Sequence, residues 1–243
     1  MPELPEVETI RCQLAKEIVG KKLKKVKVTR VRRRAKILII DLADGSSLVF
    51  HLKLTGQLLL NAKSSDYSRA VFKFDDGTNL VFNNPRGLGW WKKVEDTTDI
   101  EKGFGPEPLD KNFTLKKFKS MLSKRKNSKI KPLLMDQRFI AGIGNIYSDE
   151  ILFAAKIQPL RQVKTLRRGE VEEIFKAIKR ILKAAIKHRG STSRYYLDVF
   201  GKKGEYIKYH KVYRRENCPC CGTKIKKIKL GGRSAHYCPE CQK

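Results

Sequence analysis

The chain has 243 residues, and its 54 lysines and arginines against 25 acidic residues give a formal net charge of +29. Such an excess favours an anionic polymer as partner, and nucleic acid is a better interpretation than a merely solvated, salt-tolerant surface. No apolar run approaches the ~18 residues that a membrane span needs, and the N-terminus lacks an apolar signal region. We therefore expect neither a membrane protein nor a secreted one.

The first half of the chain is predicted to be one helix followed by strands. Residues 5–19 are typical of a helix, because Pro5 suits the first helical position and apolar residues recur at helical spacing. Two hairpins follow, over residues 37–54 and 71–82, each around an Asp-Gly turn. The pattern predicts a β-sandwich flanked by this helix, within residues 1–108. The apolar stripe of the helix consists of Val7, Ile10, Leu14 and Ile18.

The second half is predicted to be mainly helical and follows a Gly/Pro-rich linker over residues 104–109. We expect a helical domain over residues 109–211, which ends in a basic, tyrosine-rich loop at residues 191–211. A cysteine-containing module follows over residues 212–243. The fold class is therefore α+β. The predicted helices run from Thr114 to Ser123, from Lys129 to Met135, from Asn145 to Ala155 and from Thr165 to Gly190.

The strongest local pattern is a pair of Cys-x-x-Cys motifs separated by 16 residues. This spacing is typical of a tetrahedral zinc site on a β-hairpin, and it points to a reducing compartment rather than to disulfides. Cys220 competes with Cys221 as a ligand, and Gly222 favours Cys221, since a zinc knuckle needs a small residue at that point. We expect one structural Zn²⁺, bound by Cys218, Cys221, Cys238 and Cys241.

Two further segments are candidate phosphate contacts. Residues 142–147 (GIGNIY) form a glycine-rich turn that opens a helix, where exposed amides can bind a phosphate and Asn145 can add a donor. Arg233 lies at the predicted tip of the cysteine hairpin. A simple helix–helix turn explains residues 142–147 equally well, and the alternative for Arg233 is an ordinary surface arginine.

The N-terminus offers a reactive amine beside carboxylates. Once Met1 is removed, Pro2 carries a secondary amine whose pKa of about 8 leaves more of it nucleophilic at neutral pH than a lysine. Such an amine attacks a sugar carbon to give an iminium, the electron sink of covalent amine catalysis. Without context, a charge near the helix start is the better interpretation of Glu3.

Six motifs together resemble one family. In order along the chain they are residues 2–9 (PELPEVET), 33–36 (RRAK), 51–56 (HLKLTG), 105–109 (GPEPL), 142–147 (GIGNIY) and the final pair of cysteine motifs. Each motif is modest, but the set in this order resembles the formamidopyrimidine-DNA glycosylases, base-excision enzymes related to endonuclease VIII. The resemblance covers nearly the whole chain, and it implies a helix–two-turn–helix motif within the helical domain.

The resemblance implies roles for residues near the N-terminus. Pro2 would be the nucleophile that attacks the deoxyribose anomeric carbon and expels the damaged base. Glu3 would be the general acid/base that assists ring opening. Lys36 would contact phosphate near the lesion and support catalysis, and Glu6 would be a supporting carboxylate.

The resemblance also implies DNA contacts. Asn145 and Arg233 match phosphate-binding residues, while Leu54, Arg86 and Leu88 match side chains that fill the gap left by an everted nucleotide. Leu54 stands where methionine is usual, and Leu88 where an aromatic residue is usual. The chain is also shorter than the family pattern between Val28 and Arg32, which leaves the strand count open.

We therefore expect a bifunctional DNA glycosylase and AP lyase for oxidised purines that cleaves the strand by β,δ-elimination. Its partner would be double-stranded DNA with an oxidised base or an abasic site, and it would act as a monomer in the cytoplasm. The loop at residues 190–212 resembles the segment that closes over 8-oxoguanine. Two alternatives remain: an endonuclease VIII-like enzyme for oxidised pyrimidines, which Leu54 leaves open, and a non-catalytic zinc-ribbon binder of nucleic acid.

Overall fold

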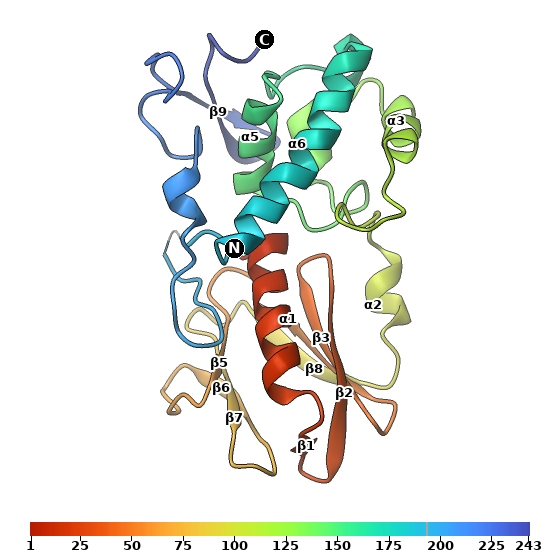
Figure 1. The fold of residues 1–243 in the computed structure, drawn as a ribbon, viewed down its shortest axis with the longest axis vertical. Coiled ribbons are helices and arrows are strands. Elements are labelled where there is room, and N and C mark those ends of the chain that lie inside the picture. The colour runs from red at the N-terminus through yellow and green to blue at the C-terminus, as the bar shows by residue number, and fades with distance from the viewer. Residues whose placement is uncertain (193) are drawn as a thin grey trace. The chain divides into compact units, whose positions relative to one another are not determined.

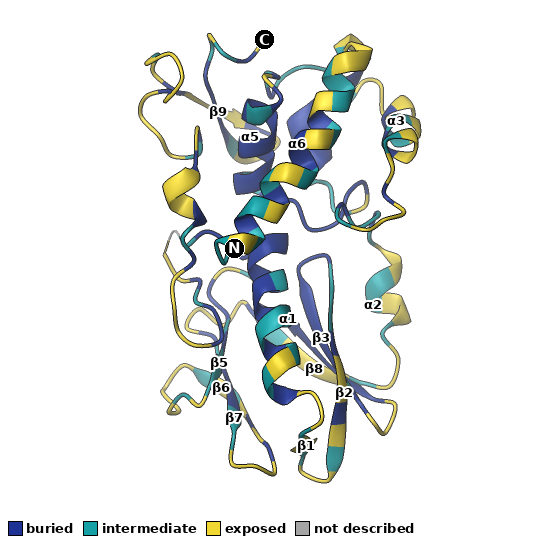
Figure 2. Ribbon diagram, in the orientation of Figure 1, coloured by how far each residue is buried: buried dark blue, intermediate teal, exposed yellow. Residues whose placement is uncertain are grey.

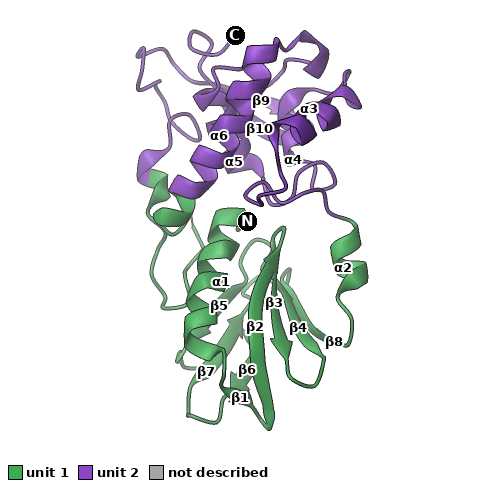
Figure 3. Cartoon of the chain, turned by 45° about the vertical axis from the view of Figure 1, so that its right-hand side comes forward, with its two compact units in different colours: residues 1–103, 185–207 green, residues 104–184, 208–243 purple. Residues whose placement is uncertain are grey.

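Figure 1 shows the computed structural model, which describes residues 1–192 and 194–243. Its contacts divide the chain into two compact units (Figure 3). The first contains residues 1–103 and 185–207, and the second contains residues 104–184 and 208–243. The α+β fold class is confirmed, with sheets in the first unit and helices with a two-stranded hairpin in the second.

This division differs from the three parts expected from the sequence, with boundaries after residues 108 and 211. Residues 185–207 belong to the first unit because Tyr196 and Val199 lie in its hydrophobic core. Apolar periodicity shows that a segment has a buried face. It does not show which partner covers that face, so the sequence alone placed this segment with the helices that precede it.

Helix α1 (Leu4–Ile18) agrees with the predicted helix to within one residue at each end. Pro5 lies in its first turn, and Glu3 and Glu6 form a reciprocal capping box at its start. The capping box satisfies amide donors that a helix start otherwise leaves unpaired. The helix buries its predicted apolar stripe, and Ile10, Leu14 and Ile18 have no solvent exposure.

The first unit contains two antiparallel sheets. The larger sheet has the order β1-β2-β3-β4-β8, and the smaller has the order β5-β7-β6. Both predicted hairpins are present, as β3–β4 and β6–β7. Short helix α2 (Thr98–Lys102) follows β8. The strands are β1 (Lys22–Leu23), β2 (Val26–Arg34), β3 (Ile37–Leu42), β4 (Ser47–His51), β5 (Gln57–Leu60), β6 (Ser68–Lys73), β7 (Asn79–Asn83) and β8 (Trp90–Val94).

The short segment between Val28 and Arg32, which left the strand count open, lies within strand β2. The chain runs through this segment as one continuous strand that pairs with β3, with a register irregularity between Val28 and Arg30. Beyond it, Val31 pairs with Ile40. A bulge takes up one extra residue and lets the pairing continue, so the larger sheet remains unbroken here.

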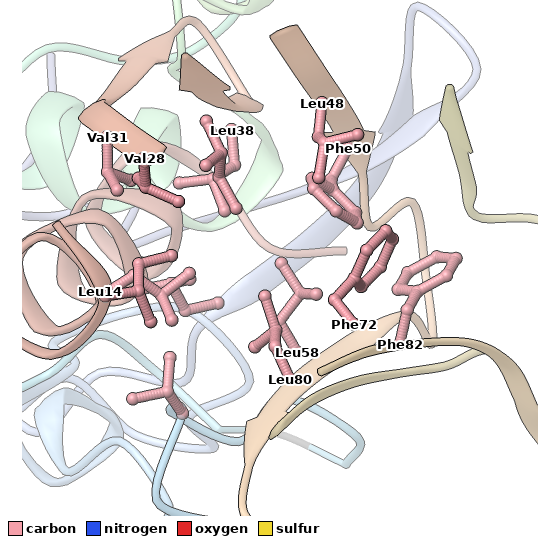
Figure 4. Packing of buried hydrophobic residues seen from close by; sticks show 14 of the residues in the cluster. Leu14, Val28, Val31, Leu38, Leu48, Phe50, Leu58, Phe72, Leu80 and Phe82 are labelled. Atoms are coloured by element: carbon pink, nitrogen blue, oxygen red, sulfur yellow. The ribbon is translucent and has the colours of Figure 1, made fainter. Parts of the chain in front are cut away.

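The core of the first unit lies between the two sheets and against α1 (Figure 4). Figure 4 shows Leu14 of α1 facing Val28 and Val31, while Phe50 points toward the smaller sheet. The Phe50 ring meets the Phe72 ring edge-on, with 5.5 Å between centroids. Side chains of both sheets thus interdigitate in one core, as in other β-sandwiches.

The second unit contains most of the helices. In Figure 2 helix α5 is buried along almost its whole length, and its buried residues include the charged Asp149 and Glu150 as well as apolar side chains. Thr114 caps α3 as predicted, accepting a hydrogen bond from the Lys117 amide at 3.2 Å. The predicted start of the last long helix at Thr165 is wrong. Among the described residues, no helix has the length and apolarity that crossing a membrane requires.

The elements of the second unit include a 3₁₀ turn, η1, which contains Thr165 and displaces the start of α6 to Arg168. Helix α6 continues into the first unit, and a second 3₁₀ turn, η2, begins in the first unit and ends in the second, near the end of the predicted loop. The elements are α3 (Leu115–Ser123), α4 (Ile130–Met135), α5 (Asn145–Ala154), η1 (Val163–Thr165), α6 (Arg168–Lys187), η2 (Tyr206–Tyr209), β9 (Lys226–Leu230) and β10 (Arg233–Tyr237).

Candidate functional site

The N-terminal residues lie at the start of α1 in the first unit. Pro2 and Glu3 are buried, whereas Met1 is 45% exposed. With Met1 in place the Pro2 nitrogen is part of a peptide bond. Removal of the exposed Met1 converts this nitrogen into the secondary amine that nucleophilic chemistry requires.

Glu6 holds the N-terminus against the segment that follows α6. Its Oε2 accepts a hydrogen bond from the Glu3 amide at 2.7 Å, and its Oε1 accepts one from the Ser191 amide at 2.7 Å. Gly190 is required beside it, because a Cβ there would lie 2.5 Å from Glu6 Oε1 and its φ is +74°. The Glu6 carboxylate therefore fixes both segments at once.

Lys36 follows a constrained turn between β2 and β3. Ala35 has a φ of +52°, and the Arg33 guanidinium donates to the Ala35 carbonyl at 2.8 Å. Arg33 also pairs with Glu8 of α1 at 2.9 Å. Lys36 itself is 7% exposed. Arg33 therefore anchors to α1 the turn from which Lys36 projects.

His51 is a residue of this region to which the sequence assigned no role. Burial, followed by the positive charges of Lys53 and Lys36, lowers its pKa to about 4. Its Nδ1 accepts a hydrogen bond from the Lys53 amide at 3.0 Å. His51 is therefore neutral at pH 7. Its place in the segment HLKLTG was a signal, but nothing in that segment shows that Lys36 lies close enough to affect its charge.

The three residues expected to fill a gap in DNA lie on two tight turns that contact each other. The Arg86 amide donates to Thr55 Oγ1 at 3.3 Å, which joins the turn after β4 to the turn after β7. Arg86 is exposed, Leu54 is 40% exposed and Leu88 is 46% exposed. Exposed leucines on two turns that are joined by a hydrogen bond are suited to insertion between bases.

These two turns are rigid for identifiable reasons. Asn84 Nδ2 donates to the Gly89 carbonyl at 2.7 Å, and the Gly89 amide donates back to Asn84 Oδ1 at 3.1 Å. The other turn is closed by the Gly56 amide, which donates to the Leu52 carbonyl at 2.8 Å. A Cβ at Gly56 would lie 2.6 Å from that carbonyl oxygen, so the turn requires glycine.

Asn145 begins α5 in the second unit. Gly142, with a φ of +86°, donates its amide to Gln137 Oε1 at 2.8 Å, and Gln137 Nε2 donates to the Ile143 carbonyl at 2.6 Å. Gln137 thereby holds the turn that presents the helix start. Asn145 Oδ1 is buried without a hydrogen-bond partner among the described residues. A helix start held in this way is a place where a phosphate can bind.

Helix α5 also binds the hairpin β9–β10. Asp149 forms an ion pair with Lys131 at 2.7 Å and a hydrogen bond with His236 Nδ1 at 3.0 Å, and Lys131 also donates to the Ser234 carbonyl at 2.6 Å. Glu150 accepts three backbone amides of residues 211–213, and burial raises its pKa. Exposed Arg233, at the start of β10, is therefore held by residues of α4 and α5.

The four predicted cysteine ligands converge. Their sulfur atoms all lie within 4.8 Å of one another, with separations such as 3.7 Å between Cys218 and Cys241 and 3.4 Å between Cys221 and Cys238. Tetrahedral Zn–S bonds of about 2.3 Å place sulfurs about 3.8 Å apart, so the cluster fits zinc. The choice of Cys221 over Cys220 agrees with this cluster, in which Cys220 takes no part.

Each unit thus carries part of the predicted set. The first unit holds Pro2, Glu3 and Lys36 together with the two apolar turns, and the second holds Asn145, Arg233 and the zinc site. Within the second unit one helix, α5, serves both phosphate candidates: Asn145 begins it, and its Asp149 fixes the strand that carries Arg233.

Known protein families match almost the whole chain. The formamidopyrimidine-DNA glycosylase N-terminal domain matches residues 1–32 and 23–91, and the H2TH domain of the same glycosylases matches residues 104–196. A zinc finger found in FPG and IleRS matches residues 215–243. These matches include the N-terminal residues, the turn before α5 and the cysteine cluster.

Individual relatives agree. The formamidopyrimidine-DNA glycosylase of Herpetosiphon aurantiacus is 40% identical over 273 residues, which cover 100% of both chains. Lactococcus lactis Fpg in complex with abasic-site DNA is 34% identical, with a TM-score of 0.89 and 99% of each chain covered. MutM in complex with DNA containing carbocyclic 8-oxo-G is 34% identical, with a TM-score of 0.88 and the same coverage.

Proposed function

We propose a function on the basis that this chain belongs to the formamidopyrimidine-DNA glycosylase family. The chain is a DNA glycosylase that removes oxidised purines, with one structural zinc bound by its four clustered cysteines. The observation that carries this conclusion is a match over the full length of both chains to relatives with this activity. The buried Pro2-Glu3 start, held by Glu6, argues against a non-catalytic binder.

The chemistry follows from Pro2. After Met1 is removed, the Pro2 amine attacks the anomeric carbon of the damaged nucleoside, and the base leaves with the bonding electron pair. The Pro2 nitrogen then loses its proton and the C1′–O4′ bond of the sugar ring breaks, with O4′ taking up a proton, which leaves an open-chain iminium. This iminium acidifies the neighbouring sugar carbon, so β- and then δ-elimination cut the strand on both sides. Glu3 exchanges the protons for ring opening, and Lys36 contacts a phosphate beside the lesion.

DNA is held and deformed by residues of both units. Asn145 and Arg233 bind phosphates, which positions the duplex without reading sequence. Leu54, Arg86 and Leu88 occupy the space that the everted nucleotide leaves, because apolar side chains on rigid turns can keep a base step unstacked. A base must leave the stack before an amine can reach its sugar.

The setting of the reaction follows from its substrate and its thiols. We propose that the chain acts as a monomer on double-stranded DNA, at the chromosome and in the cytoplasm of a bacterial-type cell. Zinc binding by four thiolates requires a reducing compartment, which supports this location.

Borohydride trapping tests the nucleophile. Protein that has lost Met1 is expected to form a borohydride-stable adduct with abasic-site DNA through Pro2, because only an iminium is reduced to a stable amine. Pro2→Gly should trap weakly. Glu3→Gln should lose base excision yet retain lyase activity on a preformed abasic site, where the aldehyde is already open. Equal trapping by a form that retains Met1, verified by intact mass, would show that another amine is the nucleophile.

A further inference from the structure

The first unit contains a cavity of about 670 Å³ that the repair chemistry does not use. Residues of both sheets line it, and none of them is among the candidate catalytic, DNA-contacting or zinc-binding residues. Trp91 of β8 and Phe72 of β6 form an aromatic wall, with ring centroids 5.0 Å apart and nearly perpendicular planes. Trp91 is 37% exposed and Val71 is 41% exposed. The cavity therefore offers apolar surface to solvent.

The edge of strand β6 borders this cavity, so residues from both faces of the strand line it. Five consecutive residues, 69–73, line it, although neighbouring side chains of a strand point to opposite faces. β6 is the last strand of the smaller sheet, and β8 is the last strand of the larger one. An isolated bridge between Leu23 and Phe74 occupies the edge just beyond the end of β6, so the part that can accept a strand is residues 69–73. Edge strands present backbone amides and carbonyls that an added strand can pair with.

The rim of the cavity is basic. Arg69 and Lys73 of β6 are exposed there, together with Lys24 and Lys93. The acidic residue in the lining, Asp44, already pairs with Lys93 at 3.2 Å. Charged residues also protect edge strands from aggregation, but that purpose needs neither a cavity nor an exposed tryptophan.

We propose that this cavity is a docking site for an extended, acidic peptide segment of a partner protein. The segment adds a strand to the edge of β6, places a bulky apolar side chain against Trp91 and sets its carboxylates near Arg69 and Lys73. Charge complementarity selects an acidic partner, and the apolar wall selects a peptide over a DNA backbone, which has no apolar side chain to insert.

Fluorescence polarisation tests this with a labelled ten-residue peptide in which aspartates alternate with leucine and phenylalanine. Lys73→Glu should weaken binding about fivefold or more, because an attraction becomes a repulsion. Lys92→Glu is the matched control: it lies on edge strand β8, changes the net charge equally and is outside the cavity lining. It should change binding by less than about twofold. Val71→Ser removes apolar surface from the cavity lining without a change of charge, and it should also weaken binding.

Three further measurements complete the test. A peptide with lysine in place of aspartate, and one with N-methylated alternate residues that cannot pair with β6, should both fail to bind. Abasic-site trapping by Lys73→Glu should equal that of the unaltered chain, which shows that the variant is folded. Equal weakening by Lys73→Glu and Lys92→Glu, displacement of the peptide by an undamaged duplex, or no binding to the unaltered chain would each overturn the proposal.

Discussion

Glu6 connects two segments that are 185 residues apart in the chain. Its carboxylate accepts the Glu3 amide on one oxygen and the Ser191 amide on the other. Glu6 is 1% exposed, so water cannot replace either bond. A residue that the family resemblance presents only as supporting is therefore the one whose contacts fix the candidate nucleophile's helix start and the segment after α6.

Glu6→Gln is expected to destabilise the first unit by about 2 kcal/mol, because one oxygen becomes an NH₂ group that faces an amide donor. Both tryptophans of the chain, Trp90 and Trp91, lie in this unit, so denaturant unfolding followed by tryptophan fluorescence reports it. Glu17→Gln, at the other end of the same helix, is the control. Equal stability of the two variants would contradict the bridging role.

His51 predicts a dependence of stability on pH. Its pKa is about 4 in the folded chain, because of burial and of Lys53 and Lys36, and about 6.5 when unfolded. Unfolding therefore takes up a proton between these values, so stability is constant above pH 6.5 and falls as the pH drops toward 4. The loss is about 3 kcal/mol at most. His51→Gln should flatten this part of the profile, as measured by tryptophan fluorescence; an unchanged slope would assign it to other groups.

At the scale of elements, α5 and the hairpin β9–β10 depend on each other. The helix holds the hairpin through Asp149, and the zinc site closes the loops at the hairpin's base. Hydrogen bonds from Thr223 lower the pKa of Cys221 to about 6, which favours the thiolate that zinc binds. The position of Arg233 therefore rests on the metal and on Asp149 of α5 near the base of the hairpin, and on Lys131 of α4, which donates to the carbonyl of Ser234 beside it.

Substitution of the neighbouring residues Cys220 and Cys221 shows which of the two is a zinc ligand. Cys221→Ser is expected to lose the zinc and unfold the hairpin, since the metal supplies much of the folding free energy of such modules. DNA binding should then fall by at least about tenfold, because Arg233 loses its position. Cys220→Ser should keep one zinc per chain and full binding. Metal analysis and duplex titration measure both effects, and the reverse result would exchange the two ligands.

The sequence predicted helices, strands and metal ligands better than it predicted which distant segments contact each other. The stripe from Val7 to Ile18 placed α1 correctly, and the cysteine spacing identified the zinc ligands, because both signals are local. Strand β8 and the bond between Arg86 and Thr55 were not predicted, since they depend on segments that meet only after folding. For the same reason the sequence assigned residues 185–207 to the helical domain, although Tyr196 packs in the sandwich core.

For the whole molecule, charge and lesion choice are separate matters. The net charge of +29 favours any duplex and carries no information about a damaged base. That information requires groups that reach the base, and the segment from Gly190 to Val212 is the candidate. Two adjacent tyrosines of this segment, Tyr195 and Tyr196, are candidates to pack on a flipped base. Tyr196 is 6% exposed within the core, whereas Tyr195 is 36% exposed, and Ser193 lies outside the described residues.

The lesion prediction is therefore tested best by a point substitution at Tyr195. Deletion of residues 193–204 would also remove Tyr196 and Val199 from the core, so its effect would mix recognition with folding.

The unaltered chain should excise 8-oxoguanine and formamidopyrimidine faster than thymine glycol or dihydrouracil in single-turnover reactions. Tyr195→Ala should slow 8-oxoguanine excision about tenfold, the loss expected for one aromatic stacking partner, and spare cleavage at abasic sites. Tyr67→Ala, an exposed tyrosine elsewhere in the unit, is the control. Fastest excision of thymine glycol by the unaltered chain would favour an enzyme for oxidised pyrimidines, because a site shaped for a purine edge gives a pyrimidine fewer contacts.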